Sequence, residues 1–479
     1  MTVKSITADV AVIGAGSAGL AAYRAARSHG ARVVLIEGGP YGTTCARVGC
    51  MPSKLLIAAA EAAHMISVAP AFGVHGGTVR IDGREVMARV RRERDRFVGF
   101  VIEGVGQIPE ADRLRGHARF TAPDCLQVDN DLRVTASRIV IATGSRPQIP
   151  AELHGAGDRL VTNDQIFEWD DLPASVAVVG TGAIGLELGQ ALHRLGVRVA
   201  VFGRGMQLAG ISDPMVLASA QKAFGAELDL RLNTRVVGAM RNGDGVALTW
   251  ATADGAEHYE EFDYVLAATG RVANVERLGL DVSGLTLDKR GVPVFNDHTM
   301  QCGAHGIFIA GDVAGERALL HEAADHGRIA GDNAGRFPDV QPGLRRAPLA
   351  IAFTDPQVAV VGDGFHALDA AHIASGEVSF ADQGRSRVML QNHGLLRVYG
   401  ASGSGRFLGA ELCGPRGEHL AHLMAWALQN EMTVEQMLLM PFYHPVVEEG
   451  LRTALRELNE KLAHGRKEID RCTDCTPGM

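Results

Sequence analysis

A strand–glycine–helix pattern occurs twice in this chain of 479 residues and constrains its fold more than any other feature. In the first copy, the apolar run 8–13 leads into a GxGxxG turn at Gly14, Gly16 and Gly19, and a helical stretch at 20–29 follows. The first glycine of such a turn permits the tight bend, the second lets the backbone approach a pyrophosphate, and the third lets helix pack on strand. A βαβ dinucleotide-binding unit is therefore predicted.

The second strand of this unit, at 33–36, ends at Glu37. An acidic residue about 20 residues after the glycines is placed to accept hydrogen bonds from a ribose hydroxyl. The positive end of the intervening helix faces the phosphates. Strand, turn, helix, strand and acid in this order distinguish the pattern from an isolated glycine turn.

The same pattern returns later in the chain. The strand 176–179 leads into Gly180, Gly182 and Gly185, and a second strand follows at 198–202. Two such units predict two bound dinucleotides. The alternative is a duplicated scaffold in which one site is inactive.

The two units differ at the end of their second strand. Gly203 stands where the first unit has Glu37, and Arg204 follows it. A missing acid with a nearby arginine accommodates a 2′-phosphate, which favours NADP(H). Gly185 and Gly189 are instead typical of NAD(H)-binding forms. Both nucleotides stay open, and we favour NADP(H) because charge at the phosphate should outweigh helix packing.

Composition excludes several classes of protein. Glycine is high at 58 residues, but there are only 18 prolines and no Gly-X-Y period, which excludes collagen. The net charge of −8 offers no basic face for nucleic acid or an anionic membrane. Seven cysteines in so long a chain are no disulfide scaffold. We expect a cytoplasmic protein with no secretory signal and no apolar run near the ~18 residues that span a bilayer.

Two cysteines, Cys45 and Cys50, follow the first unit closely. Their spacing in an ideal helix corresponds to a rise of about 7.5 Å, which exceeds the ~4.4–6.8 Å between the Cα atoms of a disulfide. A bridge would need a distorted turn, which Gly49 and the residue before Pro52 permit. Two unrelated free thiols are the alternative. A zinc site is less favoured because no second Cys/His pair lies nearby.

Residues 42–54, Gly-Thr-Thr-Cys-Ala-Arg-Val-Gly-Cys-Met-Pro-Ser-Lys, resemble the redox-disulfide motif of the pyridine nucleotide-disulfide oxidoreductases. The resemblance extends over nearly the whole chain through two ATG segments, a second flavin signature and the start of an interface domain, at 139–145, 266–271, 307–312 and 353–359. It implies an α/β fold with two Rossmann-like dinucleotide-binding domains, as in glutathione reductase, and an α+β C-terminal dimerisation domain.

The same resemblance implies FAD on the first unit and NAD(P) on the second. The residues expected at the FAD site are Gly14, Gly16, Gly19, Glu37, Thr44, Thr143, Gly144, Gly311 and Asp312. Those expected at the nucleotide site are Gly180, Gly182, Gly185, Arg204 and Gly270. No metal site is expected.

A histidine near the C-terminus completes the predicted active site. Residues 442–449 resemble the His-Pro-x-x-x-Glu element of the family. Pro445 stiffens the backbone after His444, and Glu449 can hold one ring nitrogen so that the other is aimed. Glu448 is interpreted as a solvated neighbour. In the family this histidine comes from the other subunit, so the resemblance implies a homodimer.

The resemblance also assigns roles. Cys50 would lie against the flavin and Cys45 would face a dithiol or disulfide substrate, whose thiol loses its proton to His444. Lys54 and Glu187 match an ion pair near the flavin, and the alternative for Lys54 is an exposed helix residue.

Three features depart from the family pattern. Thr43 replaces a glycine two residues before Cys45, and Arg47 between the cysteines is either a charge that lowers a thiolate pKa or a surface residue. Cys472 and Cys475 form a CxxC on a polar tail. This tail pair either shuttles electrons, binds a soft metal, or is incidental.

The segments 383–389 and 395–398 are most similar to the dihydrolipoamide dehydrogenase branch. The first hypothesis is therefore a dihydrolipoamide dehydrogenase-like enzyme acting on a small dithiol or disulfide or a lipoyl-bearing protein. The second is an NADPH-dependent disulfide or mercuric reductase that uses the Cys472/Cys475 pair. The third is a flavin-bearing redox sensor with little turnover.

The motifs also predict the domain organisation. We expect a split FAD domain at 1–150 and 276–345, an NAD(P) domain at 151–275, a dimerisation domain at 346–465 and a flexible tail at 466–479.

Overall fold

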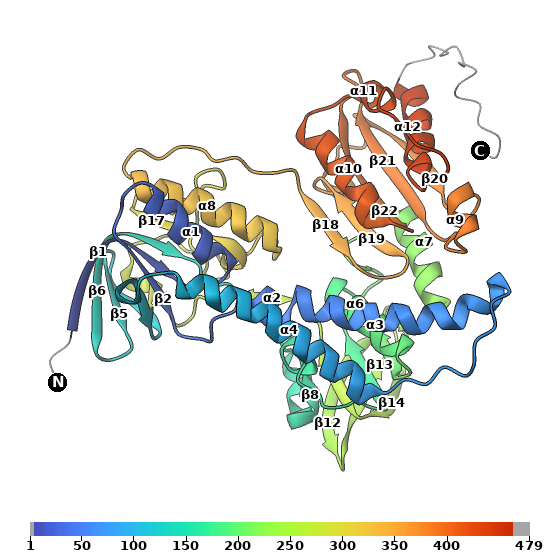
Figure 1. Cartoon of the computed structure of the whole chain (residues 1–479), viewed down its shortest axis with the longest axis horizontal. Helices are drawn as coiled ribbons and strands as arrows, with labels where there is room; N and C mark the ends of the chain where they lie inside the picture. The colour runs from blue at the N-terminus through green and yellow to red at the C-terminus, as the bar shows by residue number, and fades with distance from the viewer. Residues whose placement is uncertain (1–3, 463–479) are drawn as a thin grey trace. The chain divides into compact units, whose positions relative to one another are not determined.

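The computed structural model describes residues 4–462, so the tail cysteines Cys472 and Cys475 lie outside the described residues. The chain forms two compact units (Figure 1). The first consists of the residues up to Leu55, Met87–Gln148 and Gly270–Arg346, and the second of Leu56–Val86, Ile149–Thr269 and the residues from Ala347. The predicted assignment of domains to FAD, nucleotide and dimerisation stays a prediction.

The first unit is built on a seven-stranded sheet. Strand β1 lies between β2 and β6, parallel to both. Its residues Val10, Ala11 and Val12 are fully buried, as expected of a parallel strand that is covered on both faces. The strands of the sheet are β1 (Lys4–Ile13), β2 (Val33–Glu37), β3 (Arg113–Arg115), β4 (Ala118–Ala122), β5 (Cys125–Val128), β6 (Leu132–Ile141) and β17 (Ile307–Ile309). The pair β7 (Ser145–Pro147) and β16 (Arg271–Ala273) stands apart.

Helices α1 (Ser17–Ser28) and α8 (Leu320–Arg336) pack closely against each other in the first unit (Figure 1). A Cβ added at Gly327 would lie 2.2 Å from the Ala18 carbonyl oxygen, and one at Gly331 would lie 2.3 Å from that of Ala22. The close approach therefore depends on small residues on both helices.

Three further helices lie between β2 and β3 in the sequence. They are α2 (Thr44–Val48), α3 (Cys50–Val68) and α4 (Gly83–Gly106). Helices α3 and α4 each contribute residues to both units. The cysteine pair lies where α2 and α3 meet.

The second unit begins with a parallel sheet in the order β11-β10-β9-β15-β8, which repeats the βαβ arrangement of the first unit. An adjoining antiparallel sheet contains a hairpin whose turn lies between Ala251 and Glu257. The elements here are β8 (Leu160–Val161), α5 (Asn163–Ile166), β9 (Ser175–Val179), α6 (Ala183–Arg194), β10 (Arg198–Phe202), α7 (Pro214–Gly225), β11 (Asp229–Arg231), β12 (Arg235–Asn242), β13 (Gly245–Ala251), β14 (Glu257–Phe262) and β15 (Tyr264–Ala267).

The C-terminal part of the second unit is a five-stranded antiparallel sheet, in the order β18-β19-β22-β21-β20. Helix α10 packs on β19 and β22, while α12 packs on β20 and β21 (Figure 1). The elements are β18 (Leu349–Ala352), β19 (Gln357–Val361), β20 (Ile373–Ser379), α9 (Gly384–Val388), β21 (Leu395–Ala401), β22 (Phe407–Gly414), α10 (Gly417–Gln429), α11 (Val434–Leu438) and α12 (Glu449–Leu462).

One expectation about apolar segments is wrong. The helical stretch Thr44–Phe72 has a mean hydropathy of 1.6 and is long and apolar enough to cross a membrane, by length and composition alone. A soluble core helix passes the same test, and this stretch carries both cysteines of the predicted redox pair. The absence of a membrane partner stays a prediction.

Candidate active site

The first glycine turn has the geometry that its three glycines predict. Gly14 has φ of +108°, and a Cβ there would lie 2.3 Å from the Ala142 carbonyl oxygen. A Cβ at Gly19 would lie 1.8 Å from the Gly14 oxygen, whereas one at Gly16 would meet no atom within 4 Å. The turn is thus closed toward helix and strand and open at Gly16, where a pyrophosphate would approach the backbone.

Glu37 lies at the end of β2 beside this turn. Its carboxylate accepts hydrogen bonds from the N–H of Ala15 at 2.7 Å and of Gly39 at 2.6 Å. These bonds hold an acidic group next to the open side of the turn, as the sequence predicts for a residue that binds ribose.

The second predicted flavin signature lies in the same unit. The Asp312 carboxylate accepts a hydrogen bond from Ser145 Oγ at 2.8 Å, and Ser145 Oγ accepts one from Arg271 Nε at 2.8 Å. Thr143 Oγ1 donates to the carbonyl of Asn274 at 2.7 Å. These bonds fix the ends of three segments that are distant in sequence. The remaining predicted glycines of this unit are Gly144, Gly270 and Gly311, all with positive φ.

The cysteine pair sits at a break between two helices. Helix α2 ends before Gly49, whose φ of −122° and ψ of −118° interrupt the helix, and α3 begins at Cys50. This is the distorted turn that a Cys45–Cys50 pair requires. The side chains of Cys45 and Cys50 form a hydrogen bond, so the structure brings the two predicted redox residues together.

The surroundings of Cys45 favour its protonated form. The hydrogen bond to Cys50 raises the pKa of Cys45, and burial raises it further. The backbone N–H of Cys50 and the charge of Lys54 act in the opposite direction but do not outweigh these effects. Cys45 therefore needs a base before it can react as a thiolate.

Thr43 shows why a glycine is usual at its position. Its φ is 60° and its ψ is 152°, a region that L-residues rarely adopt. Its side chain caps α2 by accepting the Ala46 N–H at 3.3 Å, which offsets part of this strain. The predicted FAD residue Thr44 follows and is exposed.

The second glycine turn repeats the geometry of the first. Gly180 has φ of +121°, and a Cβ there would lie 2.2 Å from the Ala268 carbonyl oxygen. A Cβ at Gly185 would lie 2.0 Å from the Gly180 oxygen, and one at Gly182 would again meet no atom within 4 Å. The second unit therefore offers the same open turn to a dinucleotide.

The strand end of the second unit carries a cation instead of an acid. Arg204 follows the buried Gly203 and is exposed. The nearby Arg198 is already engaged: its guanidinium pairs with Glu260 and donates to the Glu261 carbonyl at 2.6 Å. Arg204 stays the residue predicted to meet a 2′-phosphate, and the choice between NADP(H) and NAD(H) stays a prediction.

His444 and Glu449 are in direct contact, as predicted. His444 Nδ1 lies 3.1 Å from both carboxylate oxygens of Glu449, at the start of α12. The histidine side chain is 56% exposed, whereas that of Glu449 is 9% exposed. A buried carboxylate thus orients an accessible imidazole, which is the arrangement of a general base.

The predicted pair Lys54–Glu187 remains a prediction, because Lys54 belongs to the first unit and Glu187 to the second. Glu187 is buried in α6, where its carboxylate accepts the N–H of Phe353 at 2.8 Å. Lys54 lies on α3, one turn after Cys50. The charge of Lys54 lowers the pKa of Cys45, which lies on the neighbouring helix α2.

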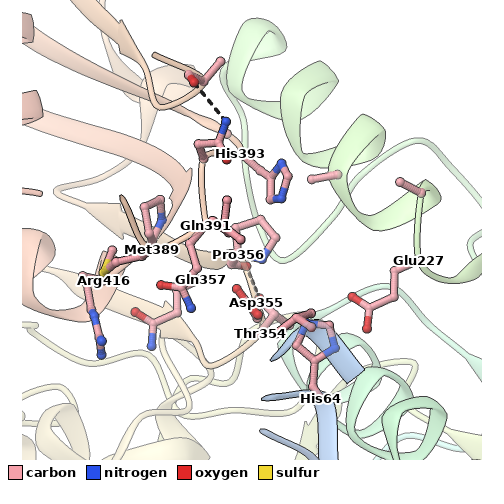
Figure 2. A pocket seen from close by; sticks show the side chains of 18 of the residues that line it. His64, Glu227, Thr354, Asp355, Pro356, Gln357, Met389, Gln391, His393 and Arg416 are labelled. Carbon is pink, nitrogen blue, oxygen red and sulfur yellow. Dashed lines mark hydrogen bonds between the residues drawn. The ribbon is translucent and has the colours of Figure 1, made fainter. Parts of the chain in front are cut away.

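The second unit contains a cavity of about 740 Å³ that was not predicted from the sequence. Figure 2 shows some of the residues that line it. The side chain of Arg194, which is 7% exposed, lines this cavity and pairs with Glu227 at 2.6 Å and Asp355 at 3.1 Å. Burial and the charge of Arg194 lower the pKa of His64, which also lines the cavity. The predicted site residues do not line this cavity. Residues of α6, α7 and the loop around Asp355 line it, and these segments are far apart in the sequence. Their charges come together only in the folded chain, so the sequence alone does not predict this cavity.

Two protein-family models match this chain. The family model described as pyridine nucleotide-disulphide oxidoreductase matches residues 8–327, and the model of its dimerisation domain matches residues 349–455. The chain belongs to this oxidoreductase family. The predicted resemblance is therefore confirmed.

Relatives within the family differ in their substrates. The chain is 32% identical to a mercuric reductase of Shigella flexneri, over 94% of this chain and 81% of the relative. It is 31% identical to a dihydrolipoyl dehydrogenase of Thermus scotoductus, over 96% and 99%. The solved structure of a Cu(II) complex of the HOCl-induced flavoprotein disulfide reductase RclA from Escherichia coli has a TM-score of 0.80 at 22% identity, over 94% and 99%.

Membership of the family fixes the coarse function. The predicted glutathione reductase-like fold with a dimerisation domain is confirmed, and the chain is an FAD-dependent pyridine nucleotide-disulfide oxidoreductase. The family binds FAD and a pyridine nucleotide. The first unit fits FAD, because the open side at Gly16 lies beside the helix α1 N-terminus, where no side chain caps the N–H groups.

Proposed function

We propose that this protein is a dihydrolipoyl dehydrogenase-like enzyme that exchanges electrons between a dithiol and NADP(H). The observation that carries the proposal is the hydrogen-bonded pair Cys45 and Cys50 at the break between α2 and α3. The pair directly follows a dinucleotide turn whose acidic strand end suits FAD. When bound, FAD supplies the two-electron exchange between the cysteine pair and the nicotinamide.

The chain's own residues supply thiol activation. Because the pKa of Cys45 is raised, the thiol holds its proton and needs a base. His444, oriented through Nδ1 by Glu449, is the proposed base and accepts the proton at Nε2. By the family arrangement, His444 acts on the cysteine pair of a second copy. Overall, the dithiol loses two electrons and two protons, NADP⁺ takes up a hydride, and one proton is released.

Arg204 is the residue proposed to determine nucleotide specificity. It is exposed at the end of β10, where the equivalent position in the first unit carries Glu37. A guanidinium forms charge-assisted hydrogen bonds to a phosphate, which only NADP(H) carries at the 2′ position. This supports NADP(H) over NAD(H).

A substrate panel with both nucleotides tests the proposal. Dihydrolipoamide, glutathione disulfide, Hg²⁺ and thioredoxin are assayed with NADP(H) and NAD(H). We expect the highest kcat/KM with dihydrolipoamide and NADP⁺. Turnover of Hg²⁺ alone, or equal use of the two nucleotides, would contradict it. No turnover with any substrate would instead support the redox-sensor alternative.

A second candidate function is an NADPH-dependent mercuric or disulfide reductase. It is favoured by the 32% identity to a mercuric reductase and by the sequence pair Cys472/Cys475. Replacing both tail cysteines by serine separates the candidates. Loss of Hg²⁺ or bulky-disulfide turnover with dihydrolipoamide oxidation intact would support the second, whereas unchanged turnover of every acceptor would leave the tail passive.

His444→Ala tests the proposed base. Loss of general base catalysis predicts a kcat about 10²–10⁴-fold lower in dithiol oxidation. The matched control is His419→Ala, an exposed histidine of the same C-terminal part. A wild-type pH–rate profile in His444→Ala would contradict the assignment.

We also propose a cytoplasmic homodimer. The dimerisation domain matched at 349–455 supports self-association, and the proposed role of His444 requires a second copy. Light scattering on the purified holoenzyme should give twice the 50.8 kDa chain mass. A monomer with full activity would contradict the dimeric active site.

A further inference from the structure

The loop that carries Arg204 is held at both ends. This loop, residues 203–212, joins β10 to α7 and is called here the 203–212 loop. Its N-terminal end is fixed by a hydrogen bond from the Gly203 N–H to the Arg231 carbonyl at 2.9 Å. Its C-terminal end meets Asp213, which caps α7 by accepting the N–H of Met215 at 2.9 Å.

The middle of the loop is tied to the glycine turn. The Ala209 N–H donates to the Thr181 carbonyl at 2.9 Å, and Thr181 Oγ1 donates to the Gln207 carbonyl at 2.7 Å. Thr181 lies between Gly180 and Gly182. The loop is therefore connected to the backbone that would face a pyrophosphate.

A buried carboxylate from another sheet fixes the C-terminal end of the loop. Glu411 on β22 is fully buried. It accepts the N–H of Ser212 at 2.8 Å, of Asp213 at 2.7 Å and of Phe365 at 2.8 Å, and it also accepts the Ser212 hydroxyl. Four donors thus satisfy a charge that burial would otherwise make costly.

A second carboxylate strengthens the same junction from the loop side. Asp213 is also fully buried, and its Oδ2 accepts hydrogen bonds from Arg397 at 2.7 Å and from Tyr399 at 3.0 Å. Arg397 and Tyr399 lie on β21, next to β22. The C-terminal sheet therefore binds both Ser212 and Asp213, at the C-terminal end of the loop.

We propose that Glu411 is a positioning residue for nucleotide recognition, which fixes the 203–212 loop so that Arg204 is held where a 2′-phosphate binds. This inference rests on the proposed NADP(H) function. The physical reason is preorganisation: a loop that is already ordered spends less binding free energy on ordering when the phosphate arrives. The turn at Gly180 is held by β9 and α6, so release of Glu411 affects the 2′-phosphate more than the pyrophosphate.

The test compares two probes on the holoenzyme, 2′,5′-ADP and 5′-ADP, by isothermal titration calorimetry. In Glu411→Gln, one acceptor oxygen becomes an NH₂ group that faces backbone donors. We expect its Kd for 2′,5′-ADP to rise about tenfold, as for loss of a hydrogen bond to a charged group. Its Kd for 5′-ADP should change less than about twofold. The ratio of KM for NADPH to KM for NADH should rise in parallel.

Two further variants keep the test decisive. Ser212→Ala removes only the hydroxyl donor and should give a smaller rise in the Kd for 2′,5′-ADP. If Glu411→Gln does not fold, this second variant still tests the positioning role. Glu431→Gln is the control, because Glu431 pairs with Arg406 at 3.1 Å and, among the described residues, neither of the two bonds to the 203–212 loop. Its nucleotide affinities should match the wild type.

The outcomes separate this inference from the proposed function. If Glu411→Gln and Ser212→Ala lose affinity equally for 2′,5′-ADP and 5′-ADP, or lose none, the positioning role is overturned. If Arg204→Gln loses 2′,5′-ADP selectively in the same experiment, only the role of Glu411 fails. If the wild type binds both probes equally, NADP(H) recognition fails and this inference fails with it.

Discussion

The two glycine turns have nearly the same backbone and opposite strand ends. In both, the first glycine has a positive φ and a Cβ there would lie 2.2–2.3 Å from a carbonyl oxygen of a neighbouring strand. The first unit then presents Glu37, bound to two backbone N–H groups, whereas the second presents the exposed Arg204. One scaffold thus holds a carboxylate in one copy and a cation in the other.

This difference separates what the fold provides from what single residues provide. The turn geometry offers N–H groups to any pyrophosphate. The strand end decides which ribose follows, since an acid accepts from free hydroxyls and an arginine attracts a phosphate. The predicted redox pair, Cys45 and Cys50, belongs to the first unit.

The largest expected effect tests where the chemistry lies. Cys45→Ser should lower dithiol–disulfide turnover at least about 10³-fold, because the thiolate is the nucleophile. Affinity for 2′,5′-ADP in the second unit should stay unchanged. The control is Cys302→Ala, because burial raises the pKa of the Cys302 thiol to about 12 and this residue lies outside the predicted redox pair. Steady-state assay and calorimetry give both readouts, and retained turnover would rule out the cysteine-pair mechanism.

A smaller effect is expected from the acid of the first unit. Glu37→Gln removes the charge that accepts the Ala15 and Gly39 N–H bonds. We expect about 100-fold weaker FAD binding, as for loss of a charged hydrogen-bond acceptor, measured from the flavin released on dialysis. The exposed Glu276 offers a control, Glu276→Gln. Normal flavin retention in Glu37→Gln would break the predicted difference between the units.

The cation of the second unit should have a more selective effect. Arg204→Gln is expected to raise the KM for NADPH about tenfold and to leave the KM for NADH unchanged, since only NADPH carries the 2′-phosphate. Arg198→Gln is the matched control, because Arg198 is paired with Glu260. A parallel change in both KM values would show that Arg204 does not read the phosphate.

The smallest effect concerns the pH dependence of Cys45. Its raised pKa means that the thiolate fraction is low at neutral pH and grows as the pH rises. Lys54 lowers this pKa, so Lys54→Met should raise it and shift the pH dependence of Cys45 alkylation in the reduced enzyme to higher pH. At pH 8 the alkylation rate should be about two- to threefold lower than in the wild type. A shift toward lower pH would contradict the sign of this interaction.

The sequence predicted the parts of the site that depend on local backbone. The spacing of Gly14 and Gly19 requires a tight turn under a helix, and His444 and Glu449 are five residues apart, so short-range geometry sets both. The disruption at Gly49 was likewise foreseen from the length of an ideal helix.

Contacts between distant segments were not predictable. Nothing in the sequence around Ser212 indicates that Glu411, on a strand almost 200 residues later, accepts its N–H. The hydrophobic periodicity of the sequence does not predict the close packing of Gly327 against Ala18 either, because this contact depends on how α8 packs on α1 in the folded chain. Such pairs are set by topology, which a single sequence does not reveal.

We propose that the nucleotide, the flavin and the cysteine pair form one electron path. Differential alkylation before and after anaerobic addition of NADPH, read by peptide mass mapping, tests it directly. We predict a Cys45–Cys50 disulfide peptide in the oxidised holoenzyme and full alkylation of both cysteines after NADPH is added. Alkylation of both cysteines before NADPH, or a disulfide that persists after it, would contradict this electron path.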